Sequence, residues 1–186
     1  MTIPNLITIG RLFLVPLTIW LIISGEHVLA FWAFVIAGVS DGVDGFIART
    51  FNQRSDLGTY LDPIADKALL VSIYVTFAIT GVLPVWLPIL VVSRDLLIVG
   101  GVVLSWMVDQ PVEMRPRAIS KVNTVFQIIL AAVVLADQAF ARALGWLPDA
   151  LIIVVGLLTL SSAIVYAIDW VRHMSEDVPP SADPLA

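Results

Sequence analysis

Long apolar stretches alternate with short polar segments along this chain. Residues 150–168 run for nineteen positions without a charged side chain, and residues 68–93 are equally uncharged, with a break at Gly81 and Pro84. A helix needs about 20 predominantly apolar residues to cross the hydrocarbon core of a bilayer. The pattern therefore predicts an all-α, polytopic membrane protein with six transmembrane helices. The expected helices cover residues 5–24, 28–49, 56–79, 84–106, 117–136 and 147–172.

Basic residues gather at one end of these expected helices. The connectors on one side, residues 25–27, 81–83 and 137–146, contain a single basic residue, Arg142. The other side carries Arg49, Arg54, Arg115, Arg117 and Arg172, and Arg11 and Lys121 lie near that end of their helices. Because basic loops stay on the cytoplasmic side, this asymmetry places both termini in the cytoplasm. The N-terminus lacks the basic region and cleavage site of a secretory signal, so we expect the first helix to be permanent.

Composition supports a membrane protein and narrows its chemistry. Of the 186 residues, 59% are hydrophobic and 13% charged, which is outside the usual range of soluble domains. The absence of cysteine excludes disulfides, thiolate nucleophiles and thiolate metal sites. We expect a membrane domain over residues 1–174 and a disordered acidic tail over residues 175–186. We expect membrane lipids as partners, and no nucleic acid.

Four aspartates form the most informative constellation. Asp41 and Asp44 are three residues apart, and Asp62 and Asp66 are four apart, so each pair shares one helix face. The short connection around residues 51–55 lets the two pairs face each other. A carboxylate within a spanning helix costs about 3 kcal/mol, or roughly 12 kcal/mol for four, unless cations compensate. Oxygen ligands of this kind suit Mg²⁺ or Mn²⁺, which commonly bind substrate phosphate as well. The aspartates therefore predict a metal site for a phosphate ester.

Small residues accompany the aspartates on both helices. Gly45 and Ala48 continue the stripe of the first acidic pair, and Gly58 and Ala65 accompany the second pair. Such stripes leave room beside the carboxylates for a ligand. Close helix packing is the commoner use of small residues in membranes, and it stays open for each of them taken singly.

The string Asp41-x2-Asp44-Gly45-x2-Ala48-Arg49-x8-Gly58-x3-Asp62-x3-Asp66 resembles the signature of the CDP-alcohol phosphotransferases, also called CDP-alcohol phosphatidyltransferases. This resemblance implies a six-helix membrane fold, a homodimer and two divalent metal ions bound by the four aspartates. It also implies that Asp66 serves as the catalytic base. The CDP group would be surrounded by Gly45, Ala48, Arg49 and Gly58.

The opening IPNLITIGR, residues 3–11, resembles the phosphatidylglycerophosphate synthases and cardiolipin synthases of this family. It suggests that Asn5, Thr8 and Arg11 lie near the donor. The donor implied by the resemblance is CDP-diacylglycerol, and the location implied is a bacterial inner membrane with the active site facing the cytoplasm.

We expect a second group of charged residues to bind the acceptor alcohol. We expect an anionic acceptor, either a lipid or a polyol phosphate, because guanidinium groups bind phosphate in a bidentate manner. The expected acceptor-binding residues are Arg94, Arg115, Arg117 and Lys121. An alternative for Arg94 is simple pairing with the neighbouring Asp95, and an alternative for the others is contact with anionic headgroups.

The strings SRDLLIVGG and RPRAISKVNTVFQIILAAVVLA resemble the cardiolipin synthases more closely. Phosphatidylglycerophosphate synthases usually show Arg-Glu at positions 94–95 and Gly-Lys-x-Lys-Thr at positions 120–124. The preferred acceptor is therefore phosphatidylglycerol, giving cardiolipin and CMP. The alternative is glycerol-3-phosphate, and inositol or serine stay open.

Two hypotheses from other classes compete with an enzyme. Intramembrane acids can mark the cation path of a transporter or channel, but transporters are expected to show broken helices and repeated halves. A catalytically inactive scaffold is disfavoured because every signature position is present. Release of CMP from CDP-diacylglycerol would separate the enzyme from both.

Overall fold

The computed structural model describes residues 3–50, 56–107, 118–140 and 143–176, and their side chains over residues 10–41, 67–100, 118–140 and 143–171. All regular secondary structure in these segments is helical, as predicted. The helices are α1 (Ile3–Ile23), α2 (His27–Thr50), α3 (Asp56–Ile79), α4 (Trp86–Met107), α5 (Ala118–Ala139) and α6 (Leu147–Glu176). The predicted bounds agree with these to within a few residues. Most of the acidic tail lies outside the described residues.

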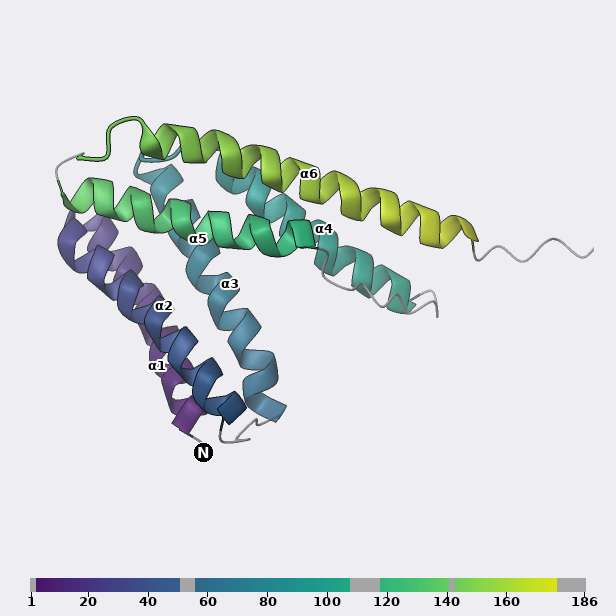
Figure 1. Ribbon diagram of the computed structural model, residues 1–186, viewed down its shortest axis with the longest axis horizontal. Coiled ribbons are helices and arrows are strands. Elements are labelled where there is room, and N and C mark those ends of the chain that lie inside the picture. Colours follow the sequence, from purple (N-terminus) through teal and green to yellow (C-terminus); the bar gives the residue numbers. More distant parts are fainter. Residues whose placement is uncertain (1–2, 51–55, 108–117, 141–142, 177–186) are drawn as a thin grey trace, which may run out of the picture.

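The six helices form two groups of three (Figure 1). Helix α1 packs against both α2 and α3, whereas α6 packs against both α4 and α5. Contacts between α2 and α5 join the groups near the end that holds the α1–α2, α3–α4 and α5–α6 turns. From this end, called the outer end below, the two groups diverge. The α2–α3 connection, and with it the aspartate motif, lies at the opposite end of the first group.

Two of the outer turns share one helix-ending geometry. Gly25 and Gly81 have φ angles of 77° and 74°, in the left-handed region that glycine adopts at little cost. Their N–H groups bond to Ile22 O and Ala78 O at 3.2 Å. The following residue in each turn bonds one position further back, which completes a Schellman motif. The break predicted at Gly81 is thus the C-terminal end of α3.

The interior of the bundle is made from apolar side chains of all the helices. Phe77 of α3, Leu87 of α4 and Leu130 of α5 are almost completely buried. On α6, Gly156 lies against the ring of Trp86, where an added Cβ would be 2.9 Å from the ring carbons. The absence of a side chain at this position lets α4 and α6 approach closely.

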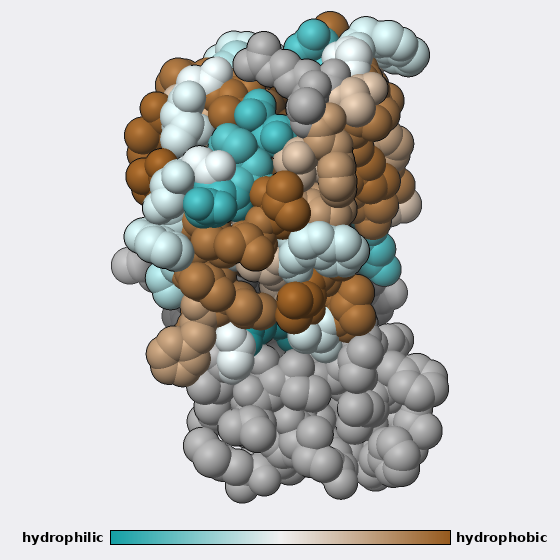
Figure 2. Space-filling view, turned by 90° about the vertical axis from the view of Figure 1, so that its left-hand side faces the viewer, coloured by the Kyte–Doolittle hydropathy of each residue, from teal (hydrophilic) through white to brown (hydrophobic). Residues whose placement is uncertain are grey.

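Apolar side chains also cover much of the outer surface. Phe13, Trp20, Ile79 and Trp146 are among the large hydrophobic residues that are more than half exposed. Figure 2 shows hydrophobic residues spread over one such face, interrupted by hydrophilic ones. A surface of this kind is stable in contact with lipid rather than water.

Two helices of the described residues are long and apolar enough to cross a bilayer, Ala118–Ala139 and Leu147–Val171. Three shorter apolar helical stretches accompany them: Gly10–Ile23, His27–Asp41 and Lys67–Ile79. These lengths agree with insertion into a membrane. Six complete spans and cytoplasmic termini stay predictions.

Candidate active site

The aspartate motif occupies the end of α2 and the beginning of α3. The backbone places its two halves on consecutive helices, both packed on α1. Asp41 is the one aspartate of the four whose side chain is described. The other signature side chains lie outside the described residues: Asp44, Gly45, Ala48, Arg49, Gly58, Asp62 and Asp66.

Arg11 of α1 reaches Asp41 across the α1–α2 hairpin. Its Nη1 donates to Asp41 Oδ1 at 2.6 Å, and the side chains of Arg11 and Asp41 are 1% and 44% exposed. The two helices are antiparallel. Arg11 lies twelve residues before the end of α1, and Asp41 lies fourteen residues after the start of α2, so the two residues are at about the same depth. The structure therefore brings Arg11, expected near the donor, to the first predicted metal ligand. The side chains of Asn5 and Thr8 lie outside the described residues.

The carboxylate of Asp41 is a suitable ligand for a hard divalent cation. Its carboxylate is half exposed, and Oδ1 is oriented by Arg11. Carboxylate oxygens are the ligands that Mg²⁺ and Mn²⁺ prefer. Among the side chains that the structure describes, no group of three or more His, Cys, Asp or Glu residues could hold a metal. A complete site thus depends on the aspartates beyond that part of the chain.

Arg94 lies buried where α4, α5 and α6 meet. It is 3% exposed, and its Nε and Nη2 donate to Ser162 Oγ at 3.2 and 2.9 Å. Nη2 also donates to Ser120 Oγ at 2.5 Å, and Nη1 donates to Asp95 Oδ1 at 2.8 Å. The guanidinium carbon lies 5.5 Å from the centre of the Tyr166 ring. Nε and Nη2 therefore join α4 to α5 and α6, whereas Nη1 pairs with Asp95 on the same helix, as in the pairing alternative for Arg94. Binding of the acceptor by Arg94 stays a prediction.

The same cluster contains Lys67, which sequence reasoning missed. Lys67 Nζ of α3 donates to Asp95 Oδ2 of α4 at 2.5 Å. The Asp95 carboxylate thus accepts from Lys67 on one oxygen and from Arg94 on the other. The available signal was a lysine inside an apolar run, since a charge within a spanning helix needs a partner.

Further polar side chains follow the inner face of α5. Ser120, Asn123 and Gln127 recur at spacings of three and four; Asn123 and Gln127 are buried, and Ser120 accepts from Arg94 of α4. Thr159 Oγ1 donates to Asn123 Oδ1 at 2.9 Å, and Tyr74 Oη donates to Gln127 O at 3.0 Å. Lys121 is exposed on the other side of α5. Arg115 and Arg117 lie outside the described residues, so the expected acceptor cluster is not brought together in the described part of the chain.

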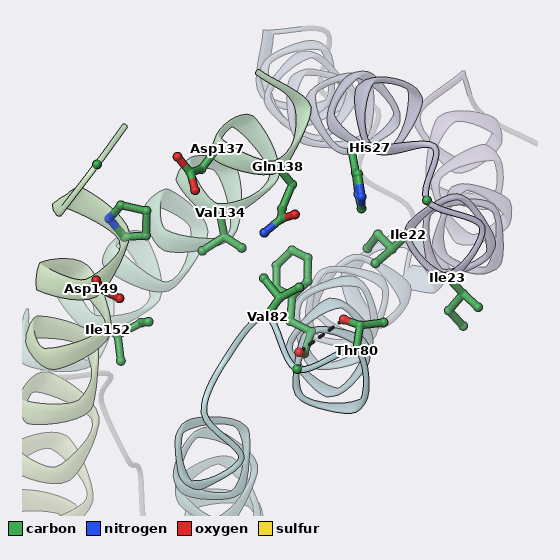
Figure 3. Close-up of a pocket in the computed structure, with 15 residues that line it drawn as sticks. Ile22, Ile23, His27, Thr80, Val82, Val134, Asp137, Gln138, Asp149 and Ile152 are labelled. Atoms are coloured by element: carbon green, nitrogen blue, oxygen red, sulfur yellow. Dashed lines mark hydrogen bonds between the residues drawn. The ribbon is translucent and has the colours of Figure 1, made fainter. Parts of the chain in front are cut away.

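The outer turns surround a cavity of about 760 Å³ (Figure 3). Its polar lining residues include His27, Thr80, Asp137, Gln138 and Asp149, and its apolar lining includes Ile22 and Val134. Asp137 Oδ1 accepts the backbone N–H of Leu144 at 3.0 Å, which shapes the α5–α6 turn. The cavity lies at the opposite end of the first helix group from the aspartate motif, so it is not the predicted site.

Comparison with known proteins identifies the family. Residues 1–171 match the CDP-alcohol phosphatidyltransferase profile, and the chain belongs to this family. The resemblance drawn from the aspartate motif is thereby confirmed. Members of this family generally depend on divalent metal ions.

Named relatives represent both candidate reactions. The chain is 37% identical over 155 residues to human cardiolipin synthase (CMP-forming), covering 75% of this chain and 52% of the relative. It is 34% identical over 195 residues to the chloroplastic CDP-diacylglycerol--glycerol-3-phosphate 3-phosphatidyltransferase 1 of Oryza sativa subsp. japonica, covering 91% and 57%. A putative cardiolipin synthase of Mycobacterium tuberculosis is 36% identical over 107 residues, covering 57% and 51%. The chain thus spans about half the length of these curated relatives.

Proposed function

We propose that this protein transfers a phosphatidyl group from CDP-diacylglycerol to an anionic alcohol and releases CMP, as a step of phospholipid synthesis. The observation that carries the proposal is the complete aspartate motif in a chain that matches the CDP-alcohol phosphatidyltransferase family from residue 1 to residue 171. Two of its relatives are named for reactions of this class.

The four aspartates would hold two Mg²⁺ or Mn²⁺ ions, which supply neutralisation of the diphosphate charge when bound. Arg11 orients the Asp41 carboxylate from the side of α1. Gly45, Ala48, Arg49 and Gly58 accommodate the cytidine nucleotide. The small residues leave space, and Arg49 offers charge to the nucleotide.

Asp66 acts as the base in the transfer. The acceptor oxygen forms a bond to the phosphatidyl phosphorus, and the bond from that phosphorus to the CMP oxygen breaks. The hydroxyl proton passes to the Asp66 carboxylate, so the alcohol becomes nucleophilic as it attacks. CMP leaves with the electron pair of the broken bond.

Phosphatidylglycerol is the preferred acceptor, and cardiolipin the product. Support comes from the local strings around Arg94 and Lys121 and from the relatives named cardiolipin synthase. Glycerol-3-phosphate is the second candidate, which the relative from Oryza sativa favours. Arg94, Arg115, Arg117 and Lys121 would provide the positive charge around the acceptor headgroup in either case. Arg94 serves the same group by holding α4, α5 and α6 together.

The proposal extends to the setting of the enzyme. Six spanning helices with cytoplasmic termini would present the aspartate motif at the cytoplasmic face of a bacterial inner membrane. Two copies would form a homodimer. Apolar side chains on the outside of the bundle support insertion, and the basic asymmetry supports the orientation.

A product analysis tests the reaction and the acceptor together. Purified protein receives CDP-diacylglycerol, Mg²⁺ and one candidate alcohol at a time, and the lipid product is identified by mass. We expect cardiolipin and an equal amount of CMP with phosphatidylglycerol, and neither from the Asp41→Asn control. Phosphatidylglycerophosphate from glycerol-3-phosphate, without cardiolipin, would replace the preferred acceptor. Absence of CMP with every alcohol would favour the transporter or scaffold hypotheses.

A further inference from the structure

An apolar groove of about 400 Å³ runs along the surface between the outer halves of α3 and α4. Val75 and Ala78 line it from α3, and Pro88 and Val92 line it from α4. Ser93 is the one polar residue of its lining, so the groove offers almost no hydrogen-bonding partner. A hydrocarbon chain matches such a surface, and a polar ligand does not.

The Lys67–Asp95 ion pair lies beyond the lining of the groove, further along the same faces of α3 and α4. Lys67, Val75 and Ala78 lie at i, i+8 and i+11 on α3, which places them on one helix face. On α4, Pro88, Val92 and Asp95 lie at i, i+4 and i+7, also on one face. Lys67 and Ala78 are separated by about 16 Å along the helix axis at 1.5 Å per residue. An extended ligand in the groove would thus have its inner end at Lys67.

The cluster of Lys67, Arg94 and Asp95 carries an excess of positive charge. Lys67 and Arg94 share the Asp95 carboxylate, so these three residues together have a formal charge of +1. The Arg94 guanidinium is buried and occupied by serine and aspartate oxygens, whereas Lys67 is 44% exposed. An ammonium group has three N–H donors, and Asp95 accepts from it at a single oxygen. A partly exposed cation beyond the end of an apolar groove is complementary to an anion that carries a hydrocarbon chain.

We propose that the α3–α4 groove binds one acyl chain of the acceptor phospholipid and that Lys67 binds the phosphate of the same lipid. This rests on the proposed function with phosphatidylglycerol as acceptor. Lys67 directly follows Asp66, the proposed base, so a lipid phosphate at Lys67 puts the headgroup hydroxyls near that carboxylate.

Filling the groove tests the acyl-chain site. Ala78→Trp and Val75→Trp introduce bulk into the groove, and Leu157→Trp places the same side chain on α6, where Leu157 is 61% exposed. We expect the two groove variants to raise the KM for phosphatidylglycerol about 10-fold, with the KM for CDP-diacylglycerol changed less than about 2-fold. The Leu157→Trp control should match the wild type. With a short-chain, water-soluble phosphatidylglycerol, the difference between groove variants and wild type should disappear.

The phosphate contact is tested by Lys67→Gln, which should raise the KM for both long-chain and short-chain phosphatidylglycerol. A photoreactive residue at Val75 should capture phosphatidylglycerol from vesicles in preference to phosphatidylcholine with the same chains. Equal capture of both lipids would mean a bulk lipid contact only and would overturn the proposal. Unchanged acceptor KM in both groove variants would also overturn it, and so would an equal rise in the donor KM. If the wild type forms no cardiolipin, the acceptor assignment and the groove proposal both fail. If it does form cardiolipin, failure of the variants concerns the groove alone.

Discussion

Replacement of Arg94 by leucine separates a structural role from a role in acceptor binding. The side chain is almost fully buried and donates to Ser120, Asp95 and Ser162 from three different helices. Leucine removes the cation and leaves Asp95 with Lys67 as its remaining partner among the described residues. Because a hydrogen bond to a charged group contributes about 1.5–3 kcal/mol, loss of the contacts to Ser120 and Ser162 should cost about 3–6 kcal/mol.

This cost should appear as reduced thermal stability. For a chain of this length, 1 kcal/mol corresponds to roughly 2–4 °C in Tm, so we expect the unfolding midpoint in detergent to fall by about 6–24 °C. Arg94→Lys keeps the charge but loses the planar fork, and it should lie between leucine and the wild type. Lys121→Ala is the matched control, because Lys121 is exposed and its removal should change Tm by less than about 2 °C.

The assay pairs thermal unfolding with steady-state kinetics at a temperature where each variant is folded. We expect Arg94→Leu to lower Tm strongly and to affect donor and acceptor kinetics together, because the packing of α4, α5 and α6 changes. An unchanged Tm with a selective rise in the acceptor KM would refute this reasoning. That result would show that Arg94 contacts the acceptor and that the serine and aspartate contacts contribute little to stability.

Three other predictions concern the metal site, the base and a packing contact. Replacement of any of the four motif aspartates by Asn, such as Asp41→Asn, should abolish transfer but leave a folded protein. Chelator should stop wild-type turnover until Mg²⁺ or Mn²⁺ is restored. Full activity in excess chelator would exclude metal dependence. Asp66→Asn should reduce kcat more than donor affinity, measured by single-turnover kinetics and CDP-diacylglycerol binding, and equal losses would remove the case for a base. Gly156→Val should displace Trp86 and lower the free energy of unfolding by about 1–3 kcal/mol, measured by thermal unfolding. Adding Trp86→Leu should restore part of this stability. An unchanged stability of Gly156→Val would contradict the close α4–α6 contact.

Much of the helical organisation can be predicted from local sequence. The six helices follow from long, mainly apolar stretches, and the end of α3 follows from Gly81, whose left-handed φ few other residues adopt. The aspartate motif could also be found locally, because its residues stand at fixed spacings on two consecutive helices. Both kinds of feature depend on neighbours within a few turns of one helix, and periodicity reveals them directly.

The long-range partners of the buried charges were decided by tertiary structure. Arg11 meets Asp41 thirty positions away, and Arg94 meets Ser162 sixty-eight positions away. Lys67 drew no attention in the sequence, yet it shares Asp95 with Arg94. Periodicity shows which face of a helix a side chain occupies, but the packing of the other helices determines what that face meets. Charges that cannot be solvated within the bundle are satisfied only where this packing brings an opposite charge or a hydroxyl group within reach.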